Sequence, residues 1–534
     1  MSNGSFQFNL EKTLIRDGMI FVNGWACHRL DSIERIRLYI DVESGFSQVV
    51  DAEMGYRRDD VAARFSGLIA AQNAGFLILG GWGTNALRAV RLVFEFAYSA
   101  PHEIALYPSP VVHSAFRVKL NGLRLMFSKG MRALKSQGLR STWTKARDYG
   151  RRRSTEDATA LATSIAQMQG HKVVWIVDHD MGGGANLYRQ QFVQTCLSEG
   201  QMVVVLGFQV ASLGYFVQFH RTGGVDRHAI STLDDVRTVL RQLQIVQLVY
   251  NCAVSFRDPL QVCRLLVSVR DEVACKLVVL IHDYFSICPS HVLLNAKAKF
   301  CELPDPQTCN DCLATHSGGF VSMTHTRDIG HWRNEWRALI ELADEVQVFS
   351  PSSWELLARA YPTTSQRHWR LLPHTLLTPT PVLDLQAGMT LHIGVVGTLG
   401  FHKGADLVAK LSQEIHDAKL NIPITVFGTI QTREPLIDVN VTGAYSPDRL
   451  AEMIEASGSN VFLLPSIWPE TFSYVAHELC AMGVPLVCFD MGAQADLVKC
   501  YVKGQVVALF EPSVLLAELV RFWETSYVPK NKLI

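Results

Sequence analysis

The chain has 534 residues, with 50 Lys or Arg balanced by 50 Asp or Glu, so its formal net charge is zero with histidines neutral. With 48% hydrophobic and 19% charged residues, the composition is globular and excludes disordered, collagen-like and coiled-coil classes. The length predicts about three or four domains. The balanced charge argues against nucleic acid as the main partner, because nucleic-acid-binding domains usually carry a basic excess.

The first ten residues lack a basic stretch followed by an apolar run, so we expect no secretory signal and a cytoplasmic protein. The twelve cysteines are too few for a disulfide scaffold, and a cytoplasmic location would keep most of them reduced.

Residues 1–110 are predicted to form an antiparallel β-sandwich. Apolar and polar residues alternate with period two in 36–42 and again in 90–96, and Gly-rich or polar turns separate the runs. Such alternation is typical of strands with one buried and one exposed face. Around the segment 55–61 this domain resembles accessory domains attached to bacterial saccharide-processing enzymes, and the resemblance implies that it binds a growing glycan or a partner subunit.

The next segment, 111–170, is predicted to be a basic helical linker. Residues 116–153 hold twelve Lys or Arg and one acidic residue, Asp148, which gives this stretch a net charge of +11. Leu, Met and Phe residues are interleaved with the charges. This mixture suits an amphipathic helix on an anionic membrane surface, and a solvated linker remains the alternative.

From residue 171 onward, predicted strands and helices alternate. The first series has strands at 172–177, 203–206, 277–281 and 345–349, and two short strands with a turn within 200–220. The second has strands at 391–397, 424–428, 461–464 and 485–489. Continuous apolar strands between helices predict two doubly wound, Rossmann-like α/β domains, 171–380 and 381–534, with a ligand cleft at the carboxyl ends of their strands.

The segment 469–485 contains two glutamates separated by seven residues. Ser473 or Thr471 can cap a helix that ends near Gly483, so Glu470 precedes the helix and Glu478 lies two turns along it. The free amides and positive end of such a helix favour a diphosphate.

This arrangement, followed by Ala481, Gly483 and Pro485, resembles the group 1 family of retaining, nucleotide-sugar-dependent glycosyltransferases with the GT-B fold. The resemblance implies transfer from a UDP- or GDP-sugar to a hydroxyl, without a catalytic metal or other cofactor. It assigns Glu470 to the donor sugar hydroxyls and Glu478 to the ribose. The amides near Thr471, Phe472 and Ser473 would bind the diphosphate.

A glycine-rich turn, 397–404, follows the first strand of the second domain. In the family that the chain resembles, the glycine at the position of Gly397 often precedes an arginine. That arginine binds the diphosphate together with a later lysine. Here Thr398 occupies the arginine position and Lys403 alone matches, so we expect Lys403 to neutralise the leaving diphosphate.

Two features of the first domain agree with this resemblance. Gly182, Gly183 and Gly184 follow its first strand, as the acceptor-side loop does in the family, although a tight turn would need the same residues. His282 ends the strand 277–281 and resembles the catalytic histidine that faces the donor sugar. Asp178 and Asp180 match a metal-binding Asp-x-Asp motif, which we discount because it adjoins the first strand of this domain, 172–177, and the glycine loop.

Cys288, Cys301, Cys309 and Cys312 are spaced closely enough to hold one structural zinc ion, with reduced buried thiols as the alternative.

The combined prediction is a glycosyltransferase peripheral to the inner face of the cell membrane. It would extend a lipid-linked or polysaccharide acceptor in the synthesis of O-antigen or exopolysaccharide. The alternatives are a non-catalytic saccharide-binding or scaffold protein, which Thr398 favours, and a phosphorylase or epimerase on a related fold. Residues 373–387 are expected to form the hinge between the α/β domains.

Overall fold

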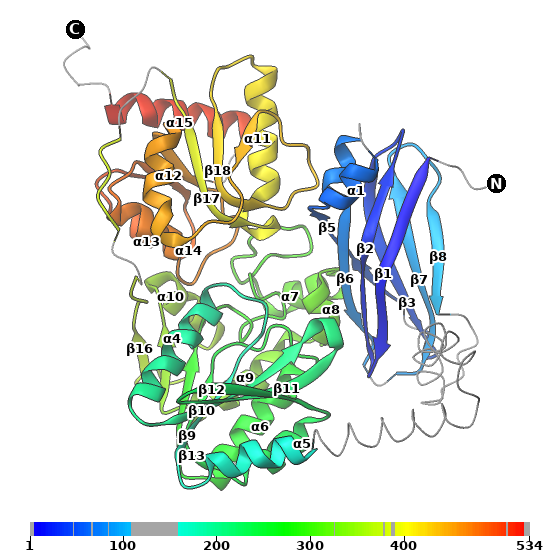
Figure 1. Cartoon of the computed structure of the whole chain (residues 1–534), viewed down its shortest axis with the longest axis vertical. Helices are drawn as coiled ribbons and strands as arrows, with labels where there is room; N and C mark the ends of the chain where they lie inside the picture. The colour runs from blue at the N-terminus through cyan, green and yellow to red at the C-terminus, as the bar shows by residue number, and fades with distance from the viewer. Residues whose placement is uncertain are drawn as a thin grey trace, which may run out of the picture.

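The structure, a computed structural model, describes residues 5–45, 47–65, 68–83, 85–107, 158–324, 326–376, 380–385, 390–508 and 511–527. The basic stretch 116–153 lies outside these residues, as do 377–379 and 386–387 of the expected hinge. The N-terminal module stands beside both α/β domains, which lie one above the other (Figure 1). Among the described residues, no helix combines the length and apolar character needed to cross a bilayer.

The N-terminal module consists of two four-stranded antiparallel sheets. One has the order β1 (Phe6–Arg16), β2 (Met19–His28), β6 (Gly75–Gly81), β5 (Glu53–Tyr56). The other has the order β4 (Ser47–Asp51), β3 (Ile33–Val42), β7 (Leu87–Phe96), β8 (His102–Tyr107). A helix, α1 (Asp59–Arg64), and a 3₁₀ turn, Ile69–Asn73, follow β5.

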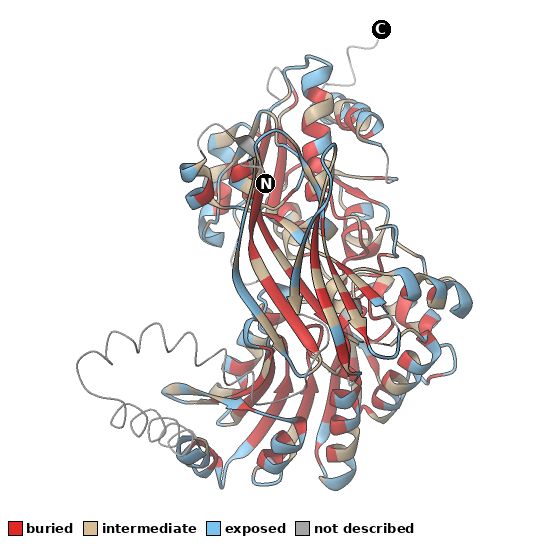
Figure 2. Ribbon diagram, turned by 90° about the vertical axis from the view of Figure 1, so that its right-hand side faces the viewer, coloured by how far each residue is buried: buried red, intermediate tan, exposed pale blue. Residues whose placement is uncertain are grey.

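The alternation seen in the sequence sets the packing of this module. Residues of β3 and β7 that share one face, such as Leu38 and Leu92, are fully buried and form one core with Ile20 and Ile78 of the other sheet. Figure 2 shows the buried faces of these strands. The predicted runs at 36–42 and 90–96 are therefore strands with one buried face.

The first α/β domain is built on an eight-stranded sheet. Its order is β12 (Gly224–Ile230), β11 (Gly214–Arg221), β10 (Met202–Gln209), β9 (Lys172–Val177), β13 (Gln244–Tyr250), β14 (Lys276–Leu280), β15 (Glu345–Val348), β16 (Trp369–Leu371). The helices are α4 (Gly184–Ser198), α5 (Leu233–Leu240), α6 (Pro259–Glu272), α7 (Pro306–Thr315), α8 (Gly319–Thr324), α9 (Ile329–Leu342) and α10 (Pro351–Ala360).

A doubly wound sheet would be wholly parallel, but this sheet is not. The pair β11 and β12 runs antiparallel at one edge, joined by a turn in which Gly223 adopts a φ of 97°. In β12, side chains alternate between partly buried and exposed, as expected for an edge strand with one solvated face. The two strands and turn expected within 200–220 correspond to β10 and β11.

The second α/β domain has a fully parallel six-stranded sheet. Its order is β19 (Val439–Val441), β18 (Ile424–Ile430), β17 (Ile393–Leu399), β20 (Val461–Leu464), β21 (Leu486–Phe489), β22 (Gly504–Val507). Its helices are α11 (Ala405–Asp417), α12 (Leu450–Ser457), α13 (Tyr474–Ala481), α14 (Gly492–Lys499) and α15 (Pro512–Tyr527). Apolar clusters on both faces of the sheet explain why its strands are continuously apolar.

The N-terminal module contacts both α/β domains. The Asp51 amide donates to the Ser317 carbonyl of the first domain at 3.2 Å, and Gln431 of the second domain donates to the Met54 carbonyl at 3.2 Å. Met19 and Phe21 of β2 belong to the core cluster of the first domain. The module thus packs against both domains as part of one assembly.

Candidate functional site

Apart from Gly397, which lies within β17, the predicted donor-binding and acceptor-side residues follow strands at the carboxyl ends of the two sheets. In each domain the strand order reverses beside the first strand, between β9 and β13 and between β17 and β20. Loops after strands on either side of such a reversal diverge and leave a crevice for a ligand. The glycine loop follows β9, Lys403 follows β17, and Glu470 follows β20.

Glu470 is 6% exposed and is held in place from several sides. Its carboxylate accepts a hydrogen bond from the Ser466 hydroxyl, and its amide donates to the side-chain oxygen of Gln494 at 3.2 Å. Gln494, on α14, also donates to the Trp468 carbonyl at 3.0 Å. The side chain of one buried glutamine therefore fixes the segment that carries Glu470.

The Lys403 ammonium lies 4.0 Å from a carboxylate oxygen of Glu470. The two side chains come from loops after neighbouring strands, and Lys403 keeps 35% of its side chain exposed. Because the Lys403 ammonium is still open to solvent, it can pair with an incoming anion without first losing all of its hydration. The structure thus brings these two predicted residues together.

The helix α13 begins where the sequence predicted. Ser473 is its N-cap, and the Ser473 hydroxyl accepts a hydrogen bond from the Ala476 amide at 3.4 Å. Thr471, the other candidate cap, has a different role: its hydroxyl donates to the backbone carbonyl of His282 at 2.7 Å. That bond joins the two α/β domains at the site.

Glu478 lies on α13 and is partly buried. Burial raises the pKa of its carboxyl group. Its charge contributes to the raised pKa values, about 12, of Tyr445 and Tyr474, although burial is the larger cause for both phenols. Among the described residues, its carboxylate has no hydrogen-bond or ion-pair partner. It is therefore a carboxylate still able to accept hydrogen bonds.

The loop that carries Lys403 is pressed against the end of β20. Gly404 has a φ of 78°, and a Cβ atom there would lie 2.0 Å from the Pro465 carbonyl oxygen. His402, in the same loop, is partly buried, and desolvation together with the neighbouring Lys403 lowers its pKa to about 4. His402 is thus neutral at pH 7. Thr398, at the position where the resemblance has an arginine, is exposed.

His282 lies across the interface from Thr471 and α13. Its ring nitrogen Nε2 is 3.0 Å from Asn251 Oδ1. The ring stacks on Phe349 at 4.6 Å and on His374 at 5.3 Å. Burial, with minor contributions from His374 and His179, holds the pKa of His282 well below its usual value. The imidazole is therefore neutral at pH 7.

The glycine loop of the first domain closes against the second domain. Gly182 and Gly183 have φ values of 84° and 85°, which a glycine adopts without strain. The Asn186 side chain accepts a hydrogen bond from the Gly182 amide at 2.6 Å. A Cβ atom on Gly184 would lie 3.3 Å from the Tyr474 ring, so glycine there permits the close approach of α13.

The sequence analysis did not identify several side chains of this interface. They form a cluster of rings around His374, which stacks on Phe349 at 4.0 Å and on Tyr474 at 5.3 Å and meets Phe472 edge-on at 4.7 Å. Tyr188, on α4, lies 5.0 Å from both His282 and His374. His374 lies in the expected hinge, where a lone histidine gives no sequence signal.

Both carboxylates of the Asp-x-Asp sequence contact other side chains of the protein. Asp178 is fully buried, and Asn186 and Arg189 contact its Oδ2 atom at 2.6 and 3.1 Å. Asp180 pairs with Arg227 at 3.0 Å. Each of the two carboxylates therefore has a partner within the first domain.

The structure does not support the zinc prediction. All four cysteines are described, and within the described part of the chain no group of three or more His, Cys, Asp or Glu is placed to hold a metal ion. Cys312 accepts a hydrogen bond from the Ala296 amide at 3.3 Å, and burial raises the pKa values of Cys288, Cys301 and Cys309. The alternative, reduced thiols packed in a folded loop, fits these contacts.

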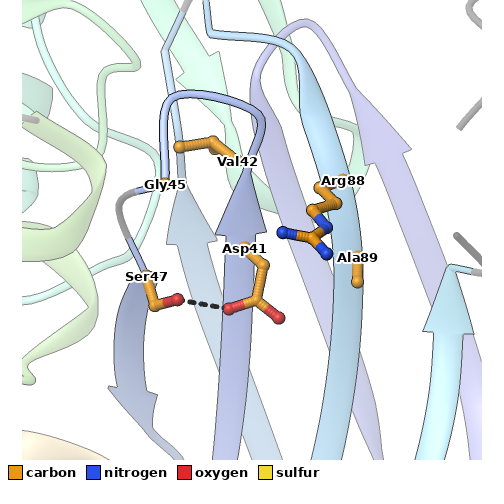
Figure 3. Close-up of a pocket in the computed structure, with 6 residues that line it drawn as sticks. All are labelled: Asp41, Val42, Gly45, Ser47, Arg88 and Ala89. Atoms are coloured by element: carbon orange, nitrogen blue, oxygen red, sulfur yellow. Dashed lines mark hydrogen bonds between the residues drawn. The ribbon is translucent and has the colours of Figure 1, made fainter. Parts of the chain in front are cut away.

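A separate hollow lies on the N-terminal module (Figure 3). Asp41 and Arg88 line it, and the Asp41 carboxylate accepts a hydrogen bond from Ser47 and pairs with Arg91 at 3.4 Å. None of the six described residues that line it is aromatic.

The comparison with protein families matches the second α/β domain. Residues 387–532 match the family model "Glycosyl transferases group 1", which leaves 1–386 outside the match. No curated protein sequence matches the chain.

Among solved structures, Alr3699/HepE of Anabaena in complex with UDP is similar at 14% identity over 66% of this chain and 90% of that chain, with a TM-score of 0.41. A glycosyltransferase of Rickettsia africae is similar at 10% identity over 67% and 89% of the two chains, with a TM-score of 0.42.

Proposed function

We propose that this protein is a retaining glycosyltransferase of the GT-B type that moves a sugar from a nucleotide diphosphate donor to a hydroxyl group. The observation that carries the proposal is the position of Lys403 and Glu470, 4.0 Å apart, beside the N-terminus of α13, with the open carboxylate of Glu478 on that helix. The family match over 387–532 supports it.

The leaving diphosphate would be stabilised by Lys403 and the amides of Phe472 and Ser473. As the glycosidic bond to the diphosphate breaks, negative charge grows on the phosphate oxygens, and fixed donors and a cation lower the free energy of that state. The neutral His402 adds no positive charge, so Lys403 is the nearest side chain able to balance the anion from this loop.

The two glutamates would bind the rest of the donor. Glu470 would accept hydrogen bonds from the sugar hydroxyls, and Glu478 from the ribose. Gln494 and Ser466 hold Glu470 in place, so little conformational entropy would be lost when the sugar binds. The donor would be a UDP- or GDP-sugar.

The acceptor would enter from the glycine loop, Gly182 to Gly184, where the backbone is open to close approach. His282 would face the donor sugar from the first domain. Holding acceptor and donor together between the domains converts the transfer into an effectively unimolecular step. We propose retention at the anomeric carbon and no metal requirement, with Lys403 and α13 supplying the charge stabilisation.

We further propose a lipid-linked or polysaccharide acceptor in bacterial surface-polysaccharide synthesis, with the +11 stretch 116–153 attached to the cytoplasmic face of the membrane. Sedimentation with vesicles that contain or lack acidic lipid would test attachment, with and without a deletion of 116–153. Equal binding of both proteins to acidic vesicles would contradict it.

The decisive experiment measures binding and consumption of a panel of UDP, GDP, ADP and CMP sugars. Lys403→Ala and Glu478→Ala should each abolish transfer while the protein stays folded. Lys410→Ala and Glu455→Ala change exposed residues of the same domain and are matched controls. Turnover at the wild-type level in both site variants would refute the assignment.

The same assay separates the rival functions. A saccharide-binding scaffold, which the exposed Thr398 favours, would bind a nucleotide sugar without consuming it. A phosphorylase would need added orthophosphate, and an epimerase would convert the nucleotide sugar without an acceptor.

A further inference from the structure

Asn251 joins three parts of the first domain at the carboxyl end of β13. The residue is 2% exposed, and its backbone N–H donates to the Val177 carbonyl at the end of β9 at 2.9 Å. Its side chain contacts Ala185, in the first turn of α4, and His282, after β14. The side-chain amide of one buried residue thus contacts both the first turn after the glycine loop and the histidine of the site.

The contacts of Asn251 define which way its amide points. Nδ2 donates to the Ala185 carbonyl oxygen at 3.2 Å, and Oδ1 lies 3.0 Å from His282 Nε2. The reversed amide would turn Oδ1 toward the Ala185 carbonyl and set two acceptors against each other in a buried place, which costs free energy. The amide oxygen therefore faces the histidine.

An amide oxygen can only accept a hydrogen bond, so His282 must donate from Nε2. In a neutral imidazole the proton on Nε2 leaves Nδ1 as an acceptor. We propose that Asn251 is a positioning residue that holds His282 as its Nε2–H tautomer and so presents Nδ1 as a hydrogen-bond acceptor for a hydroxyl of the bound donor sugar. The sugar as ligand rests on the proposed function; the tautomer does not.

The groups around His282 keep the ring uncharged. His374 stacks on it, Phe349 packs on it, and Tyr188 lies 5.0 Å away. Burial and the nearby His477 lower the pKa of His374 to about 4, so this neighbour is also neutral at pH 7. The acidic residue next in sequence, Asp283, is engaged elsewhere: its carboxylate accepts from the Cys252 thiol at 2.9 Å and from the Phe285 amide at 2.7 Å.

The test uses the full chain with ¹⁵N-labelled histidine, in which the nitrogen shifts report the tautomer, and the variant His282→Gln identifies the His282 signals. At pH 7 without ligand, wild-type His282 should be neutral and protonated on Nε2. In Asn251→Leu, which has nearly the same size, the tautomer preference should be lost. Asn186→Ala is the matched control: it alters the glycine loop next to Asn251 but should leave the His282 signals unchanged.

The kinetic expectation is a split between chemistry and nucleotide binding. Asn251→Leu should lower kcat for sugar transfer about 10-fold, the effect of losing one buried hydrogen bond. The Kd for UDP or GDP alone should stay within about twofold, because the nucleotide binds to the second domain. A merely structural role would change the melting temperature without changing the tautomer.

Two results would overturn the inference: an imidazolium or an Nδ1–H tautomer in the wild type at pH 7, or a wild-type His282 spectrum in a folded Asn251→Leu. The wild-type spectrum decides even if the variant does not fold. Failure of the proposed function would show as absence of sugar transfer by the wild type, while the tautomer result would stand.

Discussion

The Thr471 hydroxyl donates a 2.7 Å hydrogen bond to the backbone carbonyl of His282. Thr471 follows the conspicuous Glu470 of the second domain, and His282 ends a strand of the first. Nearby, the Ser352 amide of the first domain donates to Asp496 at 2.8 Å. The site is therefore assembled by contacts that exist only when the two domains are closed.

We expect Thr471→Val to lower kcat/KM for sugar transfer about 10-fold, because a buried hydrogen bond between the domains is lost. Thr471→Ser keeps the hydroxyl and should restore most of the activity. Steady-state kinetics of both variants check this prediction. Wild-type activity of Thr471→Val would show that the hydrogen bond does not matter, and a loss confined to Thr471→Ser would show that the methyl group does.

We expect the Glu478 carboxylate to lower the stability of the folded protein at pH 7 while it contributes to nucleotide binding. Burial raises the pKa of its carboxyl group above the ordinary value of 4.5, so between these two pKa values the native state binds more protons than the unfolded state. Stability therefore falls as the pH rises through this window. Glu478→Gln should have the higher melting temperature at pH 7 and no advantage below pH 4.5, and it should lose nucleotide binding. A lower melting temperature of the variant at pH 7 would contradict this prediction.

Gly404→Ala should both destabilise the protein and displace Lys403. It would combine a left-handed backbone with a Cβ atom 2.0 Å from the Pro465 carbonyl oxygen. Gly443→Ala is the control, since Gly443 has a φ of 80° and no atom within 4 Å of the added Cβ. We expect about 1 kcal/mol of destabilisation for the control and distinctly more for Gly404→Ala. Urea unfolding of both variants measures the difference.

We expect the packing of the large Trp468 side chain to stabilise the contact between the two α/β domains. It belongs to the second domain but packs in the core cluster of the first, edge-on to Tyr284 at a centroid distance of 6.3 Å. Its Nε1 atom has no hydrogen-bond partner in the described part of the chain. Trp468→Phe should therefore be mild, whereas Trp468→Ala should cost about 3–5 kcal/mol of stability. Comparable losses in chemical denaturation of the two variants would show that size is not the cause.

The sequence predicted the periodic parts of this fold well. Alternation in 36–42 and 90–96 marked strands with one buried face, and apolar runs such as 461–464 marked buried parallel strands. It missed β13, where Gln247 interrupts the apolar run, and with it Asn251. The antiparallel pair β11 and β12 also breaks the expected parallel order, because an edge strand needs only one buried face.

The sequence by itself determined that Glu470, Glu478 and Lys403 follow strands of one α/β domain, because local hydrophobic periodicity and helix capping are encoded in neighbouring residues. Only the tertiary structure decided that Lys403 lies 4.0 Å from Glu470, that Thr471 bonds to His282 instead of capping α13, and that His374 joins the ring cluster. It also left the four cysteines without a metal-binding arrangement among the described residues. The reason is that these contacts join residues from different strands and domains, whose distances depend on packing and not on spacing along the chain.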